Sequence, residues 1–156
     1  LRTQLLQGDV NDPGASLMGG VAGHAGLFGT ADEVAAIMQM LLNKGVHNGK
    51  RYLQDTTIEK FTRYFHDSTR RGLGFDKPER DNDTRENPYP CLTASPLTFG
   101  HTGFTGVCAW ADPAHQLVYV FLSNRLYPTG NLLLLSMNIR PKIHELIYQS
   151  IVGPQK

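Results

Sequence analysis

The stretch from Phe99 to Gly106, together with the residues behind it, constrains the fold of this 156-residue chain more than any other feature. Its sequence FGHTGFTG places a histidine and two threonines among three glycines. Glycine leaves the backbone open to close approach by another molecule. Over residues 107–111, Val, Ala and Ala alternate with Cys and Trp. An Asp-Pro turn separates this segment from an apolar run over 117–122. The pattern predicts an antiparallel hairpin that carries one wall of an active site.

The apolar run over 117–122 has no polar face, so we expect other elements, such as helices, to cover both sides of the sheet. A capping box that starts at Thr30 begins one helix, and Gly45 ends it in the C′ position. Asp55 is expected to cap a second helix, and a third begins near Asn138 with a proline in its first turn. Helical spacing predicts these inward faces: Val34, Ile37, Met38, Leu41 and Leu42; Ile58, Phe61 and Phe65; Ile139, Ile143, Leu146, Ile147 and Ile151.

The segment between the second helix and the hairpin is mostly polar. Residues 72–75 could form a short strand, and the charged residues over 76–90 predict a solvated, mobile surface loop. The expected fold class is α+β, an antiparallel β-sheet flanked by helices. We expect a single domain over residues 1–156, with a polar loop at about 76–98.

A formal net charge of +1 gives no reason to expect nucleic acid or an anionic membrane as a partner. No apolar run reaches the roughly 18 residues of a membrane span, and the first residues lack the pattern of a signal peptide. The chain begins at Leu1 without an initiator methionine, which suggests a piece of a longer protein. Cys91 and Cys108 lack metal or redox spacing, and we expect them to be buried and unpaired, although an oxidising compartment could pair them.

Nucleophilic catalysis needs an activated serine or cysteine beside a base, and the sequence contains no recognisable arrangement of this kind. The motifs G-x-S-x-G, S-x-x-K and Y-x-N are all absent from the 156 residues. A P-loop is absent too, and the six histidines are scattered without metal-ligand spacing. We therefore expect no metal and no cofactor, and no nucleophile within this chain.

The order of motifs resembles a known family. A glycine-rich loop over 19–29 leads into the helix start TADE at 30–33, and a long variable stretch precedes the HTG triplet at 101–103. A hairpin that ends in LSNR at 122–125 and a terminal helix follow. This order is similar to the C-terminal half of serine β-lactamase-related proteins, which include class C β-lactamases, D-alanyl-D-alanine carboxypeptidases and related esterases. Within the family it most resembles domains carried behind a family 3 glycoside hydrolase. The resemblance covers nearly the whole chain and implies a partial β-lactamase or penicillin-binding-protein-like fold.

In that family the active site lies between a helical lobe and the sheet, and a [KH]-[TS]-G triplet on the edge strand contributes to it. The resemblance puts His101 at the basic position, Thr102 at the hydroxyl position and Gly103 at the glycine position. It makes the backbone N–H of Phe104 one oxyanion donor, while the nucleophile's own N–H supplies the other. His24 in the glycine-rich loop could line the same cleft, or hydrogen bonds could simply fix it there. Histidine in place of lysine makes the charge of the triplet depend on pH, which weakens a strict β-lactamase interpretation.

The resemblance implies the C-terminal portion of a serine hydrolase that acts through an acyl-serine intermediate. Its nucleophile would lie upstream of Leu1, so the fragment alone would be inactive. The substrate would be a small or peptide-like molecule with a carbonyl or carboxylate, in the periplasm or outside the cell. The alternative is a non-catalytic module that binds peptidoglycan or glycan, or that supports a neighbouring glycosidase. An unrelated α+β domain with coincidental motifs is the third alternative. Because upstream strands complete the sheet of the family, the edge over 117–122 would be exposed, which predicts a homodimer.

Overall fold

The computed structural model of the protein describes residues 5–153. The chain divides into two compact units, Leu1–Thr30 and Ala31–Lys156. The first unit holds the short helix α1, Pro13–Leu17. Asp12 caps this helix, because its carboxylate accepts a 2.7 Å hydrogen bond from the amide of Ala15.

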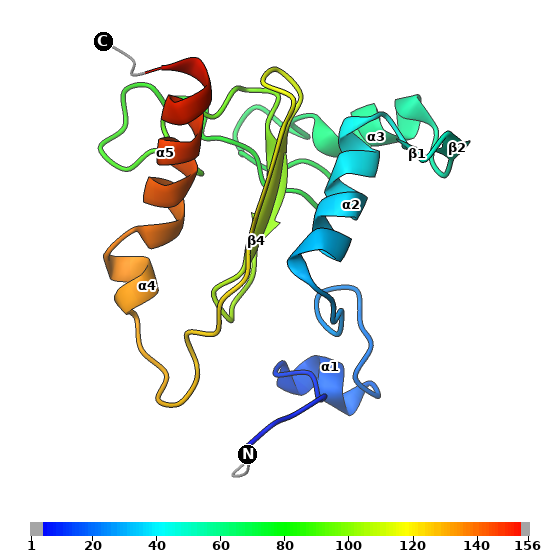
Figure 1. The fold of residues 1–156 in the computed structure, drawn as a ribbon, viewed down its shortest axis with the longest axis vertical. Coiled ribbons are helices and arrows are strands. Elements are labelled where there is room, and N and C mark those ends of the chain that lie inside the picture. The colour runs from blue at the N-terminus through cyan, green and yellow to red at the C-terminus, as the bar shows by residue number, and fades with distance from the viewer. Residues whose placement is uncertain (1–4, 154–156) are drawn as a thin grey trace. The chain divides into compact units, whose positions relative to one another are not determined.

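The second unit is built on a three-stranded antiparallel sheet. Its strands are β3 (Phe99–Thr102), β4 (Cys108–Asp112) and β5 (Leu117–Phe121), in the order β3–β4–β5. The predicted hairpin is confirmed, since β4 and β5 pair in antiparallel fashion across a tight turn. Figure 1 shows this sheet edge-on, with α2 on one side and α5 on the other. A separate two-stranded ladder consists of β1 (Val46–His47) and β2 (Lys50–Arg51).

Helices cover both faces of the sheet, as the apolar run of β5 predicts. Helix α2, Ala31–Leu42, packs on one face, and the core there consists of Met38, Leu42, Phe99 and Ala111. Helix α5, Ile139–Val152, covers the other face, and the core there consists of Cys108, Trp110 and Tyr119, with Ile143 and Ile147 packed against it. Each fully buried large apolar side chain contributes about 1.5–3 kcal/mol, so these two layers hold the second unit together.

Helix α2 ends in a Schellman motif. The amide of Lys44 donates to the carbonyl of Leu41, and the amide of Gly45 donates to the carbonyl five residues before it. Lys44 and Gly45 both have positive φ, 53° and 88°. The predicted helix is confirmed, but Gly45 lies one position farther out than expected, because Lys44 occupies C′. Ile37 is 46% exposed, so its predicted inward position is wrong; the sheet meets the neighbouring stripe that contains Met38.

Helix α3, Asp55–Thr62, is shorter than its apolar spacing suggests. Its N-cap is Gln54 rather than the predicted aspartate, whose carboxylate instead accepts a bond from the next amide in the first turn. Ile58 is buried as predicted. Phe61 and Phe65 are 44% and 67% exposed. Their predicted inward positions are wrong: Phe65 lies beyond the helix, and Phe61 is at its exposed last turn.

Helix α5 buries a different stripe from the one that its aliphatic residues predict. Leu146 and Ile151 are 63% and 54% exposed, whereas His144 and Tyr148 are enclosed. The predicted inward positions of Leu146 and Ile151 are wrong because aromatic rings fill the space beside the sheet. The imidazole of His144 stacks on the ring of Tyr119, with centroids 4.4 Å apart.

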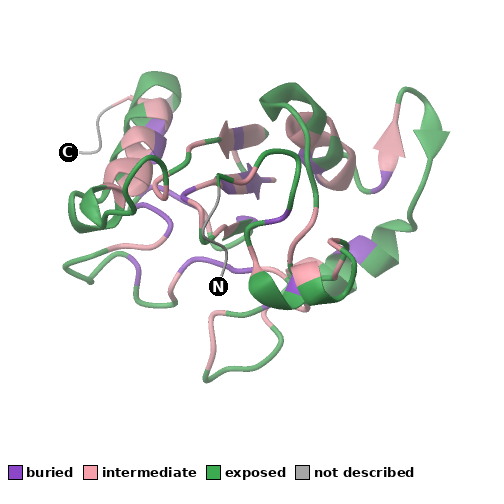
Figure 2. Cartoon of the chain, turned by 90° about the horizontal axis from the view of Figure 1, so that it is seen from below, coloured by how far each residue is buried: buried purple, intermediate pink, exposed green. Residues whose placement is uncertain are grey.

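The segment between α3 and β3 is partly built into the fold. Residues 72–75 form a turn, not the predicted strand. Asp76 pairs with Gly100 at the outer edge of β3 through backbone hydrogen bonds of 2.7 and 3.1 Å. Asp76 and Lys77 are buried, and the Lys77 ammonium donates at 2.9 Å to the carbonyl of Thr98. The prediction of a solvated loop is therefore wrong at these positions. The hydrogen bonds offset the free-energy cost of burying these polar groups. Figure 2 shows the buried and exposed stretches of the chain.

Cys91 and Cys108 are free and buried, as expected. A short helix α4, Leu133–Ser136, precedes α5. Within residues 5–153, no helix combines the length and the apolar character that crossing a membrane requires. The elements form the predicted α+β fold, with an antiparallel sheet between helices.

Candidate active-site strand

The predicted site residues lie at the end of β3 and in the turn after it. Because side chains alternate along a strand, His101 lies on the same face of the sheet as Phe99, while Thr102 lies on the same face as Gly100. The side chain of His101 is 52% exposed. Thr102 instead lines a cavity beside α5. The histidine and the threonine are thus adjacent in sequence but lie on opposite faces.

Both ring nitrogens of His101 have partners. Nδ1 lies 2.7 Å from the carbonyl oxygen of Thr102, and Nε2 lies 2.9 Å from Nη1 of Arg71. A carbonyl can only accept and a guanidinium can only donate. The Nδ1–H therefore donates to the carbonyl of Thr102, and Nε2 also lies 3.9 Å from Oδ1 of Asp76.

Asp76 organises the charged groups beside His101. Its buried carboxylate forms ion pairs with Arg70, at 2.9 Å, and with Arg71, and it accepts a 2.7 Å hydrogen bond from the hydroxyl of Tyr89. Burial alone would raise the pKa of Asp76, but the hydrogen bond from Tyr89 and the contact with Arg70 outweigh burial and hold the pKa below its usual value. Asp76 is therefore ionised at neutral pH, and it holds Arg71 against the imidazole.

The turn after β3 presents the predicted oxyanion donor. The amide of Gly103 donates at 2.8 Å to the carbonyl of Val107, and the amide of Gly106 donates at 3.0 Å to the carbonyl of Gly103. Phe104 lies in this turn and is 72% exposed. Its carbonyl accepts a 2.7 Å hydrogen bond from Nε of Arg125. Its amide has no protein acceptor in the described part of the chain, so this N–H is open to a ligand.

The three glycines of this stretch also serve the packing of the protein itself. A Cβ at Gly100 would meet a backbone carbonyl of β4 and would lie 2.6 Å from Cε3 of Trp110. A Cβ at Gly103 would lie 2.5 Å from Cγ2 of Val107. Gly106 has a φ of 114°, which side chains rarely tolerate. Their small size is therefore accounted for by neighbouring parts of the same chain.

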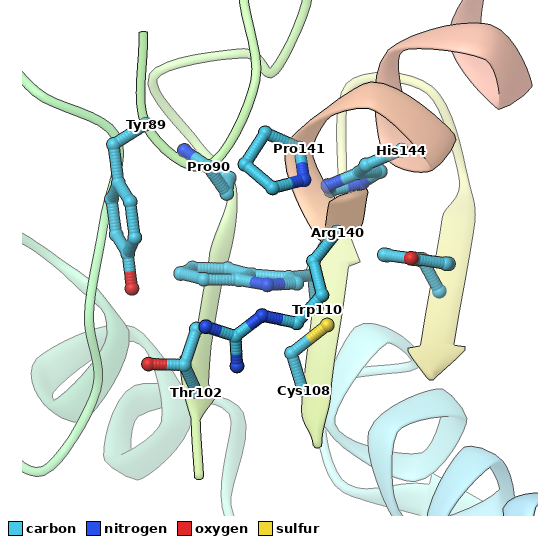
Figure 3. A pocket seen from close by; sticks show the side chains of 9 residues that line it. Tyr89, Pro90, Thr102, Cys108, Trp110, Arg140, Pro141 and His144 are labelled. Carbon is cyan, nitrogen blue, oxygen red and sulfur yellow. The ribbon is translucent and has the colours of Figure 1, made fainter. Parts of the chain in front are cut away.

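A cavity of about 30 Å³ lies between the sheet and α5. Figure 3 shows the residues around it, which come from the segment before β3, from the sheet and from the first turns of α5: Tyr89, Pro90, Thr102, Cys108, Trp110, Tyr119, Arg140, Pro141 and His144. Ligand pockets usually measure about 300–1,000 Å³, so this cavity is too small for a peptide-like molecule. The end of β3 beyond the bridge between Gly100 and Asp76, with the turn that follows it, is the better candidate for substrate binding.

His24 belongs to the first unit and has a local partner. Its Nε2 lies 3.0 Å from Oδ1 of Asp12, the carboxylate that caps α1. The amide of Ala15 and the contact with His24 hold the pKa of Asp12 below its usual value. This geometry is that of a loop histidine fixed by hydrogen bonding, and a role of His24 in substrate binding stays a prediction.

Sequence reasoning missed three residues of this cluster: Arg71, Asp76 and Tyr89. They lie in or beside the polar stretch that the sequence pattern assigns to the surface. Alternation of arginines, acids and aromatic residues was the only available signal, and it is weak. Nothing in the spacing points from Arg71 to His101, because pairing of Asp76 with β3 creates their contact.

The sequence is similar to known proteins over nearly its whole length. The Beta-lactamase family model matches residues 2–141. Two proteins named "Putative D-alanyl-D-alanine carboxypeptidase", from Salmonella enteritidis PT4 (strain P125109) and Salmonella agona (strain SL483), are each 38% identical to this chain over 156 residues. The matches cover 99% of this chain and 33% of each Salmonella protein, so the chain spans about one third of the length of these relatives. Because the family model covers most of the sequence, the chain belongs to the β-lactamase family.

Proposed function

We propose that this chain is the C-terminal part of a serine hydrolase and forms the oxyanion and substrate-binding wall of its active site. The observation that carries the proposal is the open amide of Phe104 at the end of β3. Arg125 holds the carbonyl of the same residue, so the turn is fixed before a substrate arrives. A preorganised donor of this kind contributes about 3–4 kcal/mol of transition-state stabilisation.

The nucleophile of the proposed reaction is a serine upstream of Leu1. Residues 1–156 contain no S-x-x-K motif, and the chain spans one third of its relatives. The serine oxygen attacks the substrate carbonyl and loses its proton to a neighbouring base, while the N–H of Phe104 donates to the oxyanion. The leaving group departs with a proton, and water then hydrolyses the acyl-serine. His101, Thr102 and Gly103 line the path of the substrate along β3 in this proposal.

The relatives' names favour a peptide-like substrate. They are named for D-alanyl-D-alanine, a dipeptide with a free carboxylate. We propose a cell-wall peptide as the substrate class, with a β-lactam or an ester as the alternatives, and a periplasmic or secreted location. No cofactor takes part in this reaction scheme.

The first experiment uses residues 1–156 alone. Incubation with a chromogenic cephalosporin or with p-nitrophenyl acetate should give no burst of product, because the chain lacks the nucleophile. Intact-mass spectrometry should show no acyl adduct. Detection of an acyl-serine on the fragment would contradict the placement of the nucleophile.

The second experiment restores the upstream part as a chimera, with the corresponding N-terminal part of the Salmonella enteritidis relative joined to this chain. We expect an acyl-enzyme in this chimera. Phe104→Pro removes the N–H and should lower kcat by about 10²–10³-fold, while the control Phe104→Ala keeps the N–H and most of the activity. Equal loss in both variants would remove the oxyanion role. Failure of the chimera to form an acyl-enzyme would favour the non-catalytic module that binds peptidoglycan or glycan.

We also propose that the isolated chain self-associates through β5. Within the described residues β5 pairs with β4 alone, and an open strand edge is a template for another chain. Light scattering should give a mass above that of the monomer at high concentration. A concentration-independent monomer mass would contradict this proposal.

A further inference from the structure

The cavity between the sheet and α5 contains only one residue of the HTG triplet. Thr102 lines it, on the face of the sheet that Gly100 shares, whereas His101 lies on the opposite face. A space of about 10–15 Å³ is enough for one water-sized group, and the cavity measures about 30 Å³. It therefore has room for one small ion or for about two water molecules.

Two buried side chains on the cavity wall have polar atoms without a hydrogen-bond partner. Tyr119 and His144 are 6% and 2% exposed, and within the described residues neither the hydroxyl of Tyr119 nor Nδ1 of His144 is bonded. The neighbouring thiol of Cys108 is only a weak acceptor. Burial raises the pKa of Tyr119 well above its usual value, so its hydroxyl keeps its proton and can donate to a ligand in the cavity.

Arg140 brings a positive charge to the same cavity from the first turn of α5. Its Nη1 donates at 2.9 Å to the carbonyl of Val107, and Figure 3 shows its side chain extending toward Thr102 and Cys108. Arg140 is partly buried and forms no ion pair within the described part of the chain. None of the nine described residues that line the cavity is acidic. A guanidinium in such surroundings favours a negatively charged ligand.

The acidic groups near His144 already have other partners. Asp112 and Glu145 both act on the imidazole. Asp112 accepts several hydrogen bonds of its own, and Glu145 accepts from the amide and the hydroxyl of Thr93 at 2.9 and 2.6 Å. Within the described residues neither carboxylate pairs with Arg140. An anion in the cavity can supply the missing counter-charge, whereas a water molecule cannot.

We propose that this cavity binds one small monovalent anion of the size of chloride. The anion accepts hydrogen bonds from the guanidinium of Arg140 and from the hydroxyl of Tyr119, and Nδ1 of His144 donates to it when that nitrogen carries the ring proton. Arg140 and His144 belong to α5, and Tyr119 belongs to β5. The anion therefore links the terminal helix to the sheet, and because the site exists only in the folded chain, binding stabilises the fold.

The first test uses Trp110 as a built-in reporter, since it is the only tryptophan of the chain and lines the cavity. Bromide quenches indole fluorescence on contact, and Trp110 is only 2% exposed, which shields it from bromide in bulk solution. Sodium bromide replaces sodium gluconate, whose anion is too large for the cavity, at a constant ionic strength of about 0.2 M. We expect quenching that saturates and that added chloride reverses by competition. Absent quenching, or quenching that rises linearly throughout the titration, would overturn the inference.

The matched variants test whether the charge of Arg140 holds the anion. Arg140→Gln should weaken bromide binding at least about tenfold, because it removes a charged donor. The control Arg63→Gln removes an exposed guanidinium from the end of α3 and should change the affinity less than about twofold. Equal affinities in the two variants would overturn the assignment of the site to Arg140.

The second test compares thermal unfolding in sodium chloride and in sodium gluconate, so it does not depend on Trp110 or on the folding of Arg140→Gln. The parent chain should unfold at a higher temperature in chloride. Tyr119→Phe keeps the ring that stacks on His144 but removes the hydroxyl, and the difference between the two salts should shrink. Equal unfolding temperatures of the parent chain in both salts would mean that the cavity holds water only, and would overturn the anion site.

Discussion

The hydroxyl of Tyr148 on α5 donates a 2.6 Å hydrogen bond to Oδ2 of Asp112 at the end of β4. Asp112 is buried and accepts further bonds from the amide and hydroxyl of Ser95, from the amide of Ala114 and from Nδ1 of His115. Burial would raise the pKa of Asp112, but the hydrogen bonds from Ser95, Tyr148 and His115 outweigh it and hold the pKa well below its usual range. One carboxylate thus joins the terminal helix, the sheet and the segment before β3.

Tyr148→Phe should destabilise the protein because it removes one of these bonds to a charged, buried acceptor. Hydrogen bonds to charged groups contribute about 1.5–3 kcal/mol, and we expect a loss of that size in the free energy of unfolding. Urea denaturation followed by circular dichroism measures it. Tyr52→Phe makes the same chemical change at an exposed tyrosine and should leave stability within about 0.5 kcal/mol. Equal stability of the two variants would show that the Asp112 contact contributes nothing.

His144 should make stability fall as the solution becomes acidic. Burial lowers the pKa of His144 to about 4, whereas an unfolded histidine titrates near 6.5. Between these values the unfolded chain binds the proton and the native protein does not, so the stabilisation is complete above about pH 6.5 and is lost as the pH falls toward 4. From pH 7 to 5 the free energy of unfolding should drop by about 2 kcal/mol.

The test compares His144→Phe with the parent chain at pH 7 and pH 5. Phenylalanine keeps a ring between Tyr119 and Tyr148 but does not titrate, so the variant should lose most of this pH dependence. His66→Phe changes an exposed histidine and should retain it. Protonation of the paired carboxylates Asp76 and Asp112 should lower the free energy of unfolding further at lower pH. An unaltered slope in His144→Phe would contradict the assignment.

The sequence predicts the hairpin and the existence of three main helices because periodicity carries that information. The sequence does not show which face of a helix is buried where several apolar stripes compete. On α5 the aliphatic spacing favours Leu146 and Ile151, yet His144 and Tyr148 fill the interior. Burial of a histidine and a tyrosine is favourable only when the groups that they contact are in place. Here those groups belong to Asp112 and Tyr119, which come from strands far away in sequence.

The candidate site likewise combines residues that the sequence predicts with residues that it does not predict. The HTG triplet is local, and the resemblance places it on an edge strand; in the structure His101 and Thr102 end β3 and Gly103 begins the turn that follows. The contact between Arg71 and His101 is not local. It exists because Asp76 pairs with β3 and becomes buried, and a charged stretch gives no sign of such burial before the fold is known.

Both thiols should be unreactive in the native protein. Burial raises the pKa of Cys108 to about 11 and that of Cys91 further still. At pH 8 only about one Cys108 thiol in a thousand is ionised, and the thiolate is the reactive form. We expect labelling by a chromogenic disulfide reagent at least about 100-fold slower than that of a model thiol. The control is the same reaction in about 8 M urea, where both thiols should react rapidly because the protein is unfolded. Rapid labelling without urea would contradict the buried positions of the two thiols.

Gly100→Ala should destabilise the sheet at the point where Asp76 joins β3. The added Cβ would lie 2.6 Å from Cε3 of Trp110 and would also meet a backbone carbonyl of β4, and such overpacking costs about 1–3 kcal/mol. Gly130→Ala is the matched control, since its Cβ would lie no closer than 3.8 Å to any neighbour. Both variants lose the same freedom in the unfolded chain, so their difference in the free energy of unfolding isolates the clash. Urea denaturation should place Gly100→Ala below Gly130→Ala by that amount, and two equal midpoints would mean that Trp110 moves aside without cost.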